Sequence, residues 1–333
     1  MDLFELTRTL IDIPSTTGEE RAVAQFLESY LKDLKYKVEF QEVENGRGNI
    51  IATTKAPPKV VFSTHLDTVP PHIPSTETQD TIFGRGACDA KGILAAQIFA
   101  AEKLRAHGVA EIGLLFTVDE EMASAGAAVA NEHERASDCR YLINGEPTDN
   151  YLAVGTKGSL RLKIVAEGRS AHSAYPEHGE SAIDKLLLVL AGIRSCDWPK
   201  DPFFGETTCN IGTIHGGTRP NVVPEHAEAV LQIRLVTEAS GIKAMLEKVV
   251  NGRARIEYLS VHHPVRLVSV KGFSECVVRF TTDIPYLSNW GKALLLGPGS
   301  ILDAHTANER IPKVELERAV DLYVQLAKTL LRS

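Results

Sequence analysis

Histidine and carboxylate side chains follow several apolar runs of this 333-residue chain, where they could bind metal or move protons. The apolar residues 60–62 lead directly to His65 and Asp67. Alternate side chains of an extended chain point the same way, so this imidazole and this carboxylate can face one site. A carboxylate that accepts one ring N–H of a histidine frees the other nitrogen for a metal. The spacing therefore predicts a metal ligand with a supporting carboxylate.

Further acids and a second histidine recur in similar settings. Asp89 follows a glycine-rich stretch, His305 follows the last apolar strand, and Glu120, Glu121 and Glu146 each follow an apolar run. Imidazole and carboxylate ligands without cysteine suit Zn²⁺, with Co²⁺ or Mn²⁺ as alternatives. These acids exceed the needs of one tetrahedral ion. They favour two ions about 3.5–4 Å apart, bridged by a carboxylate and a water.

Glu120 and Glu121 are neighbours, and neighbouring side chains of an extended chain point to opposite sides. One of the two can then bind a metal while the other faces the bridging water. A glutamate in that second position can accept the proton of the water and pass it to a leaving amine. The pattern predicts metal-dependent hydrolysis of an amide.

The elements that must position these residues alternate between strands and helices. In the first part of the chain we expect helices at 17–34 and 93–106, and strands at 37–43, 49–53, 60–64, 112–118 and 140–143. Thr17 and Glu20 have the spacing of a capping box at the first of these helices. The alternation predicts an α/β sheet, in which ligands bind at the carboxyl ends of the strands.

The middle third has the order strand, helix, strand, strand, helix, strand. These elements are expected at 158–166, 180–193, 208–214, 227–236, 241–250 and 254–261. This order is the ferredoxin-like arrangement, so residues 155–262 are predicted to form an inserted domain. Residues 1–154 and 263–333 then form the metal-binding domain, which ends in a strand at 293–296 and a helix at 314–331 that packs on the first sheet.

Composition argues against several classes of partner. The net charge of −7 argues against nucleic acid, and no apolar run approaches the length of a membrane span. The N-terminus lacks the basic region and apolar core of a signal peptide. The five cysteines are scattered and never form a Cys-x-x-Cys pair, which is typical of reduced thiols. We therefore expect a cytoplasmic protein.

Seven motifs occur in one order across nearly the whole chain. They are His65-Leu66-Asp67-Thr68-Val69, Gly84-Arg85-Gly86 through Asp89-Ala90-Lys91-Gly92, Asp119-Glu120-Glu121 with Ser124-Ala125-Gly126, Glu146-Pro147, Gly168 through Ser170-Ala171-His172-Ser173, Gly216-Gly217-Thr218 with Asn221-Val222-Val223-Pro224, and Asp303-Ala304-His305. With these motifs the chain resembles the M20 metallopeptidases and deacylases. The resemblance implies a zinc-peptidase-type mixed α/β sheet flanked by helices, with an inserted ferredoxin-like (βαββαβ) domain that acts as lid and mediates homodimerisation.

The resemblance also implies a set of ligands for two zinc ions per subunit. His65 and Glu146 would hold one ion, and Glu121 and His305 would hold the other. Asp89 would bridge the two, and the peptide bond that follows it would be cis.

Five more residues receive roles from the resemblance. Glu120 would be the general acid/base, and Asp67 would orient the neighbouring histidine ligand. His172 would reach into the active site of the partner subunit and stabilise the oxyanion. Arg219 and Asn221 would contact the carboxylate or carbonyl of the substrate.

The reaction implied is removal of the acyl group from an N-acyl amino acid by a metal-bridging hydroxide. Residues 282–287 and 297–305 look most like the acetylornithine deacetylase branch. That likeness implies N-acetylornithine, N-acetylcitrulline or N-acetyllysine as the small-molecule substrate, in amino-acid (arginine) biosynthesis. An M20 dipeptidase or an N-succinyl-amino acid desuccinylase is the alternative. A non-catalytic lid-dimer binding protein would be expected to lack a ligand or Glu120, and none is missing.

Overall fold

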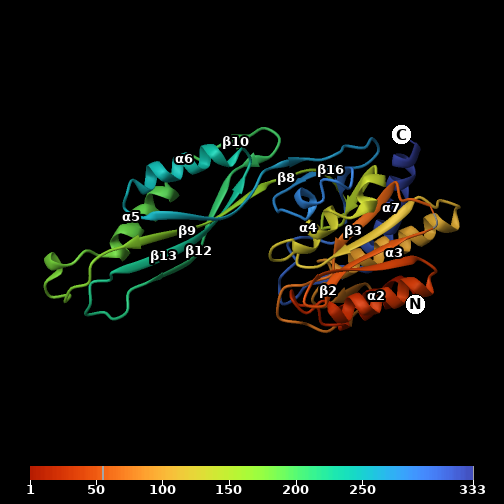
Figure 1. Cartoon of the computed structure of the whole chain (residues 1–333), viewed down its shortest axis with the longest axis horizontal. Helices are drawn as coiled ribbons and strands as arrows, with labels where there is room; N and C mark the ends of the chain where they lie inside the picture. The colour runs from red at the N-terminus through yellow and green to blue at the C-terminus, as the bar shows by residue number, and fades with distance from the viewer. Residues whose placement is uncertain (55, 333) are drawn as a thin grey trace. The chain divides into compact units, whose positions relative to one another are not determined.

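The structure, a computed structural model, describes residues 1–54 and 56–332 (Figure 1). The chain forms two compact units. The first unit comprises Met1–Val154, Leu267–Cys276 and Thr282–Ser333, and the second comprises Gly155–Arg266 and Val277–Thr281. Among the helices that the structure describes, none is both long enough and apolar enough to cross a membrane.

A mixed sheet forms the centre of the first unit, with strand order β1-β2-β6-β3-β7-β17-β8. The strands are β1 (Lys37–Glu44), β2 (Arg47–Thr53), β3 (Val60–His65), β6 (Ile112–Thr117), β7 (Tyr141–Asn144), β8 (Leu152–Thr156) and β17 (Lys292–Leu295). β3 runs parallel to β6 and β7, and β17 runs parallel to β7. Four strands therefore end along one edge of the sheet.

Helices cover both faces of this sheet. They are α1 (Leu3–Asp12), α2 (Arg21–Asp33), α3 (Lys91–Ala106), α4 (Ala125–Asn131) and α7 (Lys313–Arg332). Alternate strand residues supply two cores, because successive side chains of a strand point to opposite faces. Phe62 and Phe116 belong to the larger core with α3 and α7, whereas Val61 and Leu115 belong to the smaller core with α4.

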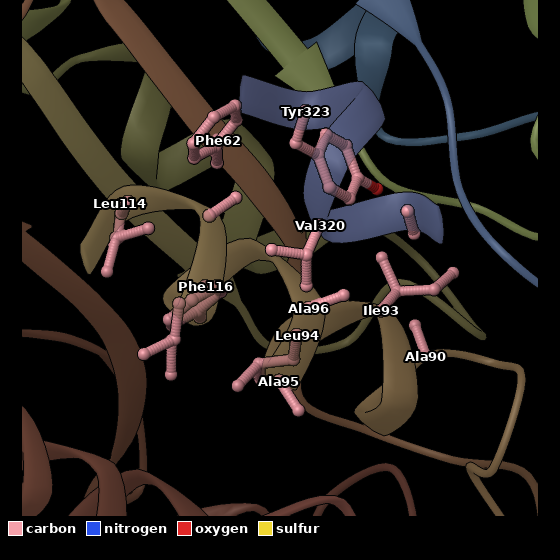
Figure 2. Packing of buried hydrophobic residues seen from close by; sticks show 14 of the residues in the cluster. Phe62, Ala90, Ile93, Leu94, Ala95, Ala96, Leu114, Phe116, Val320 and Tyr323 are labelled. Atoms are coloured by element: carbon pink, nitrogen blue, oxygen red, sulfur yellow. The ribbon is translucent and has the colours of Figure 1, made fainter. Parts of the chain in front are cut away.

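The final helix packs on the first sheet, as predicted. Figure 2 shows Tyr323 and Val320 of α7 beside Phe62 of β3 and Ile93 of α3. The ring centroids of Tyr323 and Phe62 lie 5.3 Å apart. Both helices are thereby held against the strand that ends in His65.

Most predicted elements of this unit are confirmed, but the start of the second helix was predicted wrongly. α2 begins at Arg21, and Glu20 makes no side-chain capping bond to it. Oε1 of Glu20 instead lies 3.0 Å from Nη1 of Arg47. The hydroxyl of Thr17 donates a hydrogen bond to the carboxylate of Asp67. The capping-box prediction failed because tertiary partners engage both side chains. α1 was not predicted, although Leu3, Leu6 and Leu10 are buried at helical spacing.

The second unit has the predicted βαββαβ order. Its elements are β9 (Gly158–Glu167), α5 (Ala182–Arg194), β12 (Thr208–Gly216), β13 (His226–Leu235), α6 (Ala239–Val250) and β14 (Arg255–His262), with the short pair β10 (Lys200–Asp201) and β11 (Gly205–Glu206). The four long strands form an antiparallel sheet of order β12-β13-β9-β14. Alternate apolar residues of β9 and β13 form one core with apolar residues of α5 and α6. Figure 1 shows these two helices beside the sheet.

Short strands complete the chain. β4 (Thr76–Glu77), β5 (Thr81–Phe83) and β18 (Arg310–Pro312) form a small sheet, and β15 (Val265–Arg266) and β16 (Glu275–Val278) pair with β8.

Candidate metal centre

Three of the candidate ligands leave the first sheet at one edge. His65 is the last residue of β3, Glu121 follows β6, and Glu146 follows β7. β3 pairs in parallel with both neighbours, and His65 lies opposite Thr117, the last residue of β6. Because parallel strands end at the same edge of a sheet, the turns that follow them emerge side by side.

The other two candidate ligands come from loops. Asp89 precedes α3, and the peptide bond between Asp89 and Ala90 is cis, as predicted. His305 lies between β17 and β18 and has a left-handed backbone with φ 62°. Such a φ is uncommon outside glycine and is often found at functional sites.

Asp89 lies between two groups of candidate metal ligands. Its Oδ1 is 3.0 Å from Nε2 of His65, and its Oδ2 is 3.3 Å from Nε2 of His305. Nε2 of His65 is 4.0 Å from Oε2 of Glu146, and Nε2 of His305 is 2.9 Å from Oε1 of Glu121. The Asp89 carboxylate thus has one histidine and one glutamate on either side of it.

The carboxylate of Asp67 lies near His65 and also accepts hydrogen bonds from the Glu120–Glu121 turn. Nδ1 of His65 is 2.9 Å from the main-chain oxygen of Asp67 and 3.5 Å from its Oδ1, so the main-chain oxygen is the nearer partner. Oδ1 accepts the main-chain N–H of Glu120, and Oδ2 accepts that of Glu121, both at 3.1 Å. Oδ2 also accepts the hydroxyl of Thr17 at 2.8 Å. Asp67 therefore anchors the turn that carries both glutamates.

That turn corrects the sequence argument about the two glutamates. β6 ends at Thr117, and Asp119 has φ 71°, so Glu120 and Glu121 do not lie on an extended chain. Successive N–H groups of an extended strand point to opposite sides. Here both amides point to one carboxylate, that of Asp67. The extended-chain reasoning was therefore wrong, and the roles of the two glutamates stay a prediction.

Burial and crowding of acids dominate the electrostatics of the site. Burial, followed by the charge of Glu146, raises the pKa of Glu120 well above its usual value. Burial likewise raises the pKa of Glu146, and it raises that of Glu121 against the opposing hydrogen bond of His305. Burial would also raise the pKa of Asp89, but its contacts with the two histidines outweigh this and lower it.

The residues present fit divalent cations. Oε1 of Glu146 is buried and has no hydrogen-bond partner among the described residues. A buried polar atom without a partner is costly, and a bound cation would satisfy it and offset the repulsion between the acids. Imidazole nitrogens and carboxylate oxygens are donors that Zn²⁺, Co²⁺ and Mn²⁺ accept. The ligand atoms of His65, Asp89 and Glu121 all lie within 4.8 Å of one another.

Two buried acids near this site were not predicted. Asp283 accepts the hydroxyl of Thr117 at 2.7 Å, burial raises its pKa to about 6, and its charge raises the pKa of Glu120. Glu309 pairs with Arg85 at 2.6 Å. The sequence gives only weak indications of these two acids. Asp283 lies in residues 282–287, which carry only the likeness to the acetylornithine deacetylase branch, and Glu309 follows no apolar run.

The remaining predicted residues belong to the second unit. His172 is exposed, and its strand bridge to Val222 joins two loops. The N–H of Ser173 donates to the main-chain oxygen of Asn221, so His172 and Asn221 lie in one region. Arg219 lines a neighbouring pocket of about 450 Å³ with residues 216–218. The structure thus brings these three residues together within the second unit, and the seven others within the first.

Comparison with known proteins decides the family. Residues 154–256 match the family model described as peptidase dimerisation domain. A peptidase M20 domain-containing protein of Schizosaccharomyces pombe is 37% identical, with an alignment that covers 99% of this chain and 85% of that protein. The chain belongs to the M20 peptidase family. The chain is also 38% identical to a protein of Paracoccidioides lutzii named "Probable carboxypeptidase", with an alignment that covers 97% of this chain and 84% of that protein.

Solved structures share the fold of this M20 protein. A tripeptidase from Staphylococcus aureus superposes with a TM-score of 0.81 at 21% identity, covering 99% of this chain and 98% of that chain. The YXEP protein of Bacillus subtilis, described as a dinuclear metal binding peptidase from the M20 family, has a TM-score of 0.71 at 16% identity and the same coverages. The predicted fold class, a mixed α/β sheet with an inserted ferredoxin-like domain, is confirmed.

Proposed function

We propose that this M20 protein is a metal-dependent hydrolase that cleaves the amide bond of an N-acyl amino acid. The arrangement of Asp89 between two histidine–glutamate pairs carries the proposal. In it, His65 and Glu146 hold one ion, His305 and Glu121 hold the other, and Asp89 serves both. Zinc is the proposed metal, with Co²⁺ or Mn²⁺ as substitutes.

Such ions, when bound, supply Lewis-acid activation of a carbonyl and of water. In the proposed reaction, Glu120 accepts a proton from the attacking water and returns it to the leaving amine. Burial and the neighbouring Glu146 raise the pKa of Glu120 above its usual value, a direction common among carboxylates that act in general acid–base catalysis. Asp67 binds the main-chain N–H of Glu120 and so limits the positions of that carboxylate. The products are a carboxylic acid and a free amino acid.

The first proposed substrates are N-acetylornithine, N-acetylcitrulline and N-acetyllysine, which would place the enzyme in arginine or related amino-acid biosynthesis. The likeness of residues 282–287 and 297–305 to the acetylornithine deacetylase branch supports them. Cleavage of a short peptide next to its free carboxylate is the second candidate. The name of the Paracoccidioides lutzii relative favours it. Both reactions break an amide bond whose nitrogen belongs to an amino acid.

The proposed assembly is a homodimer through a lid domain at 155–262, with residues 1–154 and 263–333 as catalytic domain. The match to a dimerisation domain supports this. So do β12, an edge strand of its sheet, and the exposed apolar side chains of Leu187 and Leu188 on α5. We also propose the inferred roles for His172, in the active site of the partner, and for Arg219 and Asn221, at the substrate carboxylate. A cytoplasmic location stays a prediction.

A substrate panel tests the proposal. Protein loaded with zinc is incubated with the three N-acetyl amino acids, N-succinyl amino acids and N-blocked dipeptides that end in a free carboxylate. Release of free amino acid from the acetyl compounds is the expected result. Preferential cleavage of the dipeptides would identify a peptidase instead. Absence of turnover on every compound, with two ions bound per chain, would refute the hydrolase assignment.

A further inference from the structure

Glu309 is buried beneath the loop that carries Asp89. One oxygen of its carboxylate, Oε1, accepts three main-chain N–H groups, from Gly86 at 2.9 Å, Cys88 at 3.3 Å and Asp89 at 3.2 Å. The side chain of Glu309 is fully buried. The main chain at Asp89 is therefore tied to a single carboxylate that comes from the far end of the sequence.

Arg85 holds the other oxygen of that carboxylate and extends the connection. Its Nη1 lies 2.6 Å from Oε2 of Glu309 and also donates to the main-chain oxygen of Thr306 at 3.2 Å. Its Nε donates to the main-chain oxygen of Pro71 at 3.3 Å. Thr306 directly follows His305. One guanidinium thus joins the anchor of Asp89 to the backbone beside His305.

Burial of this pair has a cost that limits its net contribution to stability. Two charges taken out of water lose their hydration, and a buried pair often contributes little net stability. Here the bonds of Arg85 and Glu309 converge on the backbone of two candidate ligands. The relevant effect is the fixed spacing between Asp89 and His305.

The His305 side of the site depends on this spacing more than the His65 side does. His65 ends a strand paired on both sides, and Glu146 follows a neighbouring strand of the same sheet. The side chain of His305 is 49% exposed and comes from a loop. The position of His305 is therefore set by loop contacts, among which the bond from Arg85 to Thr306 adjoins it directly.

We propose that Arg85 and Glu309 are positioning residues that set the distance between Asp89 and His305, and with it the affinity for the ion on the His305 side. The inference rests on the proposed function, because it assumes that the site holds two ions. Neither residue contacts the substrate or the ions in this proposal. Outer partners that orient metal ligands typically change metal affinity by about 10–100-fold when they are removed.

Titration calorimetry of metal-free protein with Zn²⁺ tests the proposal, followed by Co²⁺ absorption spectra of the same samples. Glu309→Gln keeps the shape of the side chain but presents an amide N–H₂ either to Arg85 or to the main-chain donors. We expect one of the two ions to bind about 10–100-fold more weakly and the other to be retained. The Co²⁺ spectrum is expected to lose the contribution of the weakened site.

Arg85→Lys is the second variant, and it keeps a charge beside Glu309 while it loses the guanidinium fork that also reaches Thr306. Its affinity for the weakened ion is expected to lie between the affinity of the unmodified protein and that of Glu309→Gln. Leu104→Ala, in the core at the far end of α3, is the matched control for general destabilisation. It is expected to lower thermal stability and leave both affinities unchanged.

Three results separate the possibilities. Two ions bound with unchanged affinities by Glu309→Gln and Arg85→Lys would overturn the proposal. Equal weakening of both ions, reproduced by Leu104→Ala, would also overturn it and would indicate a purely structural pair. Failure of the unmodified protein to bind two ions would instead overturn the proposed function.

Discussion

The Asp67 carboxylate offers a direct test of how the Glu120–Glu121 turn is held. We consider the substitution Asp67→Asn, which keeps the size of the side chain and replaces one acceptor oxygen by a donor N–H₂. Oδ1 and Oδ2 each accept one main-chain N–H of the turn. Whichever way the amide is oriented, one of these N–H groups then faces a donor and is left without a partner.

The size of the effect follows from these bonds. A hydrogen bond to a charged acceptor contributes about 1.5–3 kcal/mol, and a buried donor left unpaired costs a similar amount. The remaining bond also weakens, because its acceptor is now neutral. The expected loss is about 3 kcal/mol, which corresponds to a fall in melting temperature of about 6–12 °C for a unit of this size. If the turn must regain its geometry for each turnover, kcat falls by about 10²-fold.

Thr17→Val is the matched control. It removes the hydroxyl that donates to Oδ2 of Asp67 but leaves both main-chain bonds of the turn in place. Its expected cost is about 1.5 kcal/mol, the lower end of that range, because Thr17 is only partly buried. Thermal unfolding, kcat on the best substrate of the panel, and metal content measured by mass spectrometry would be compared for both variants. A kcat of Asp67→Asn within about threefold of the unmodified protein, with the melting temperature unchanged, would refute the anchoring role.

Three further outcomes are expected. Glu120→Gln should keep two ions by mass spectrometry yet lose at least about 10²-fold in kcat, because the amide cannot accept the proton; unchanged turnover would contradict the general-base role. In metal-free protein, hydrogen bonds with Asp89 and Glu121 raise the pKa of His305 to about 10. The ring is therefore protonated at pH 7 and must lose that proton, so zinc affinity should rise with pH; calorimetry in buffers of different ionisation enthalpy should detect proton release, and its absence would argue against His305 as a ligand. Leu187→Glu should convert a dimer to a monomer in light scattering because it places a charge on α5, whereas Val314→Glu, at a still more exposed apolar position on the first unit, should not.

The strand ends of the first unit could be predicted from local patterns. Apolar runs that stop at a histidine or an acid located His65, Glu121 and Glu146, because strand length and burial are properties of short segments. The convergence of these residues followed from the parallel arrangement, in which strands end at one edge. The order of elements in the second unit could be predicted for the same reason.

Contacts between distant segments could not be predicted in this way. Asp283 and Thr117 are 166 residues apart in sequence, and Glu309 and Arg85 are 224 apart. No periodicity of a single segment records such a pair. The failed capping box of α2 has the same cause, because Glu20 is bound by Arg47 from a neighbouring strand.

The longer segment of the second unit, Gly155–Arg266, begins and ends at almost one point. Gly155 and Arg266 lie directly opposite each other in the antiparallel pair of β8 and β15. Cα atoms in such positions are about 4.5–5.5 Å apart, a gap that a two-residue turn can close. A gene that replaces the intervening codons by those for Asn-Gly would therefore encode a continuous chain with all five candidate ligands. Because these ends are adjacent, a segment of a different length could join the same two strands.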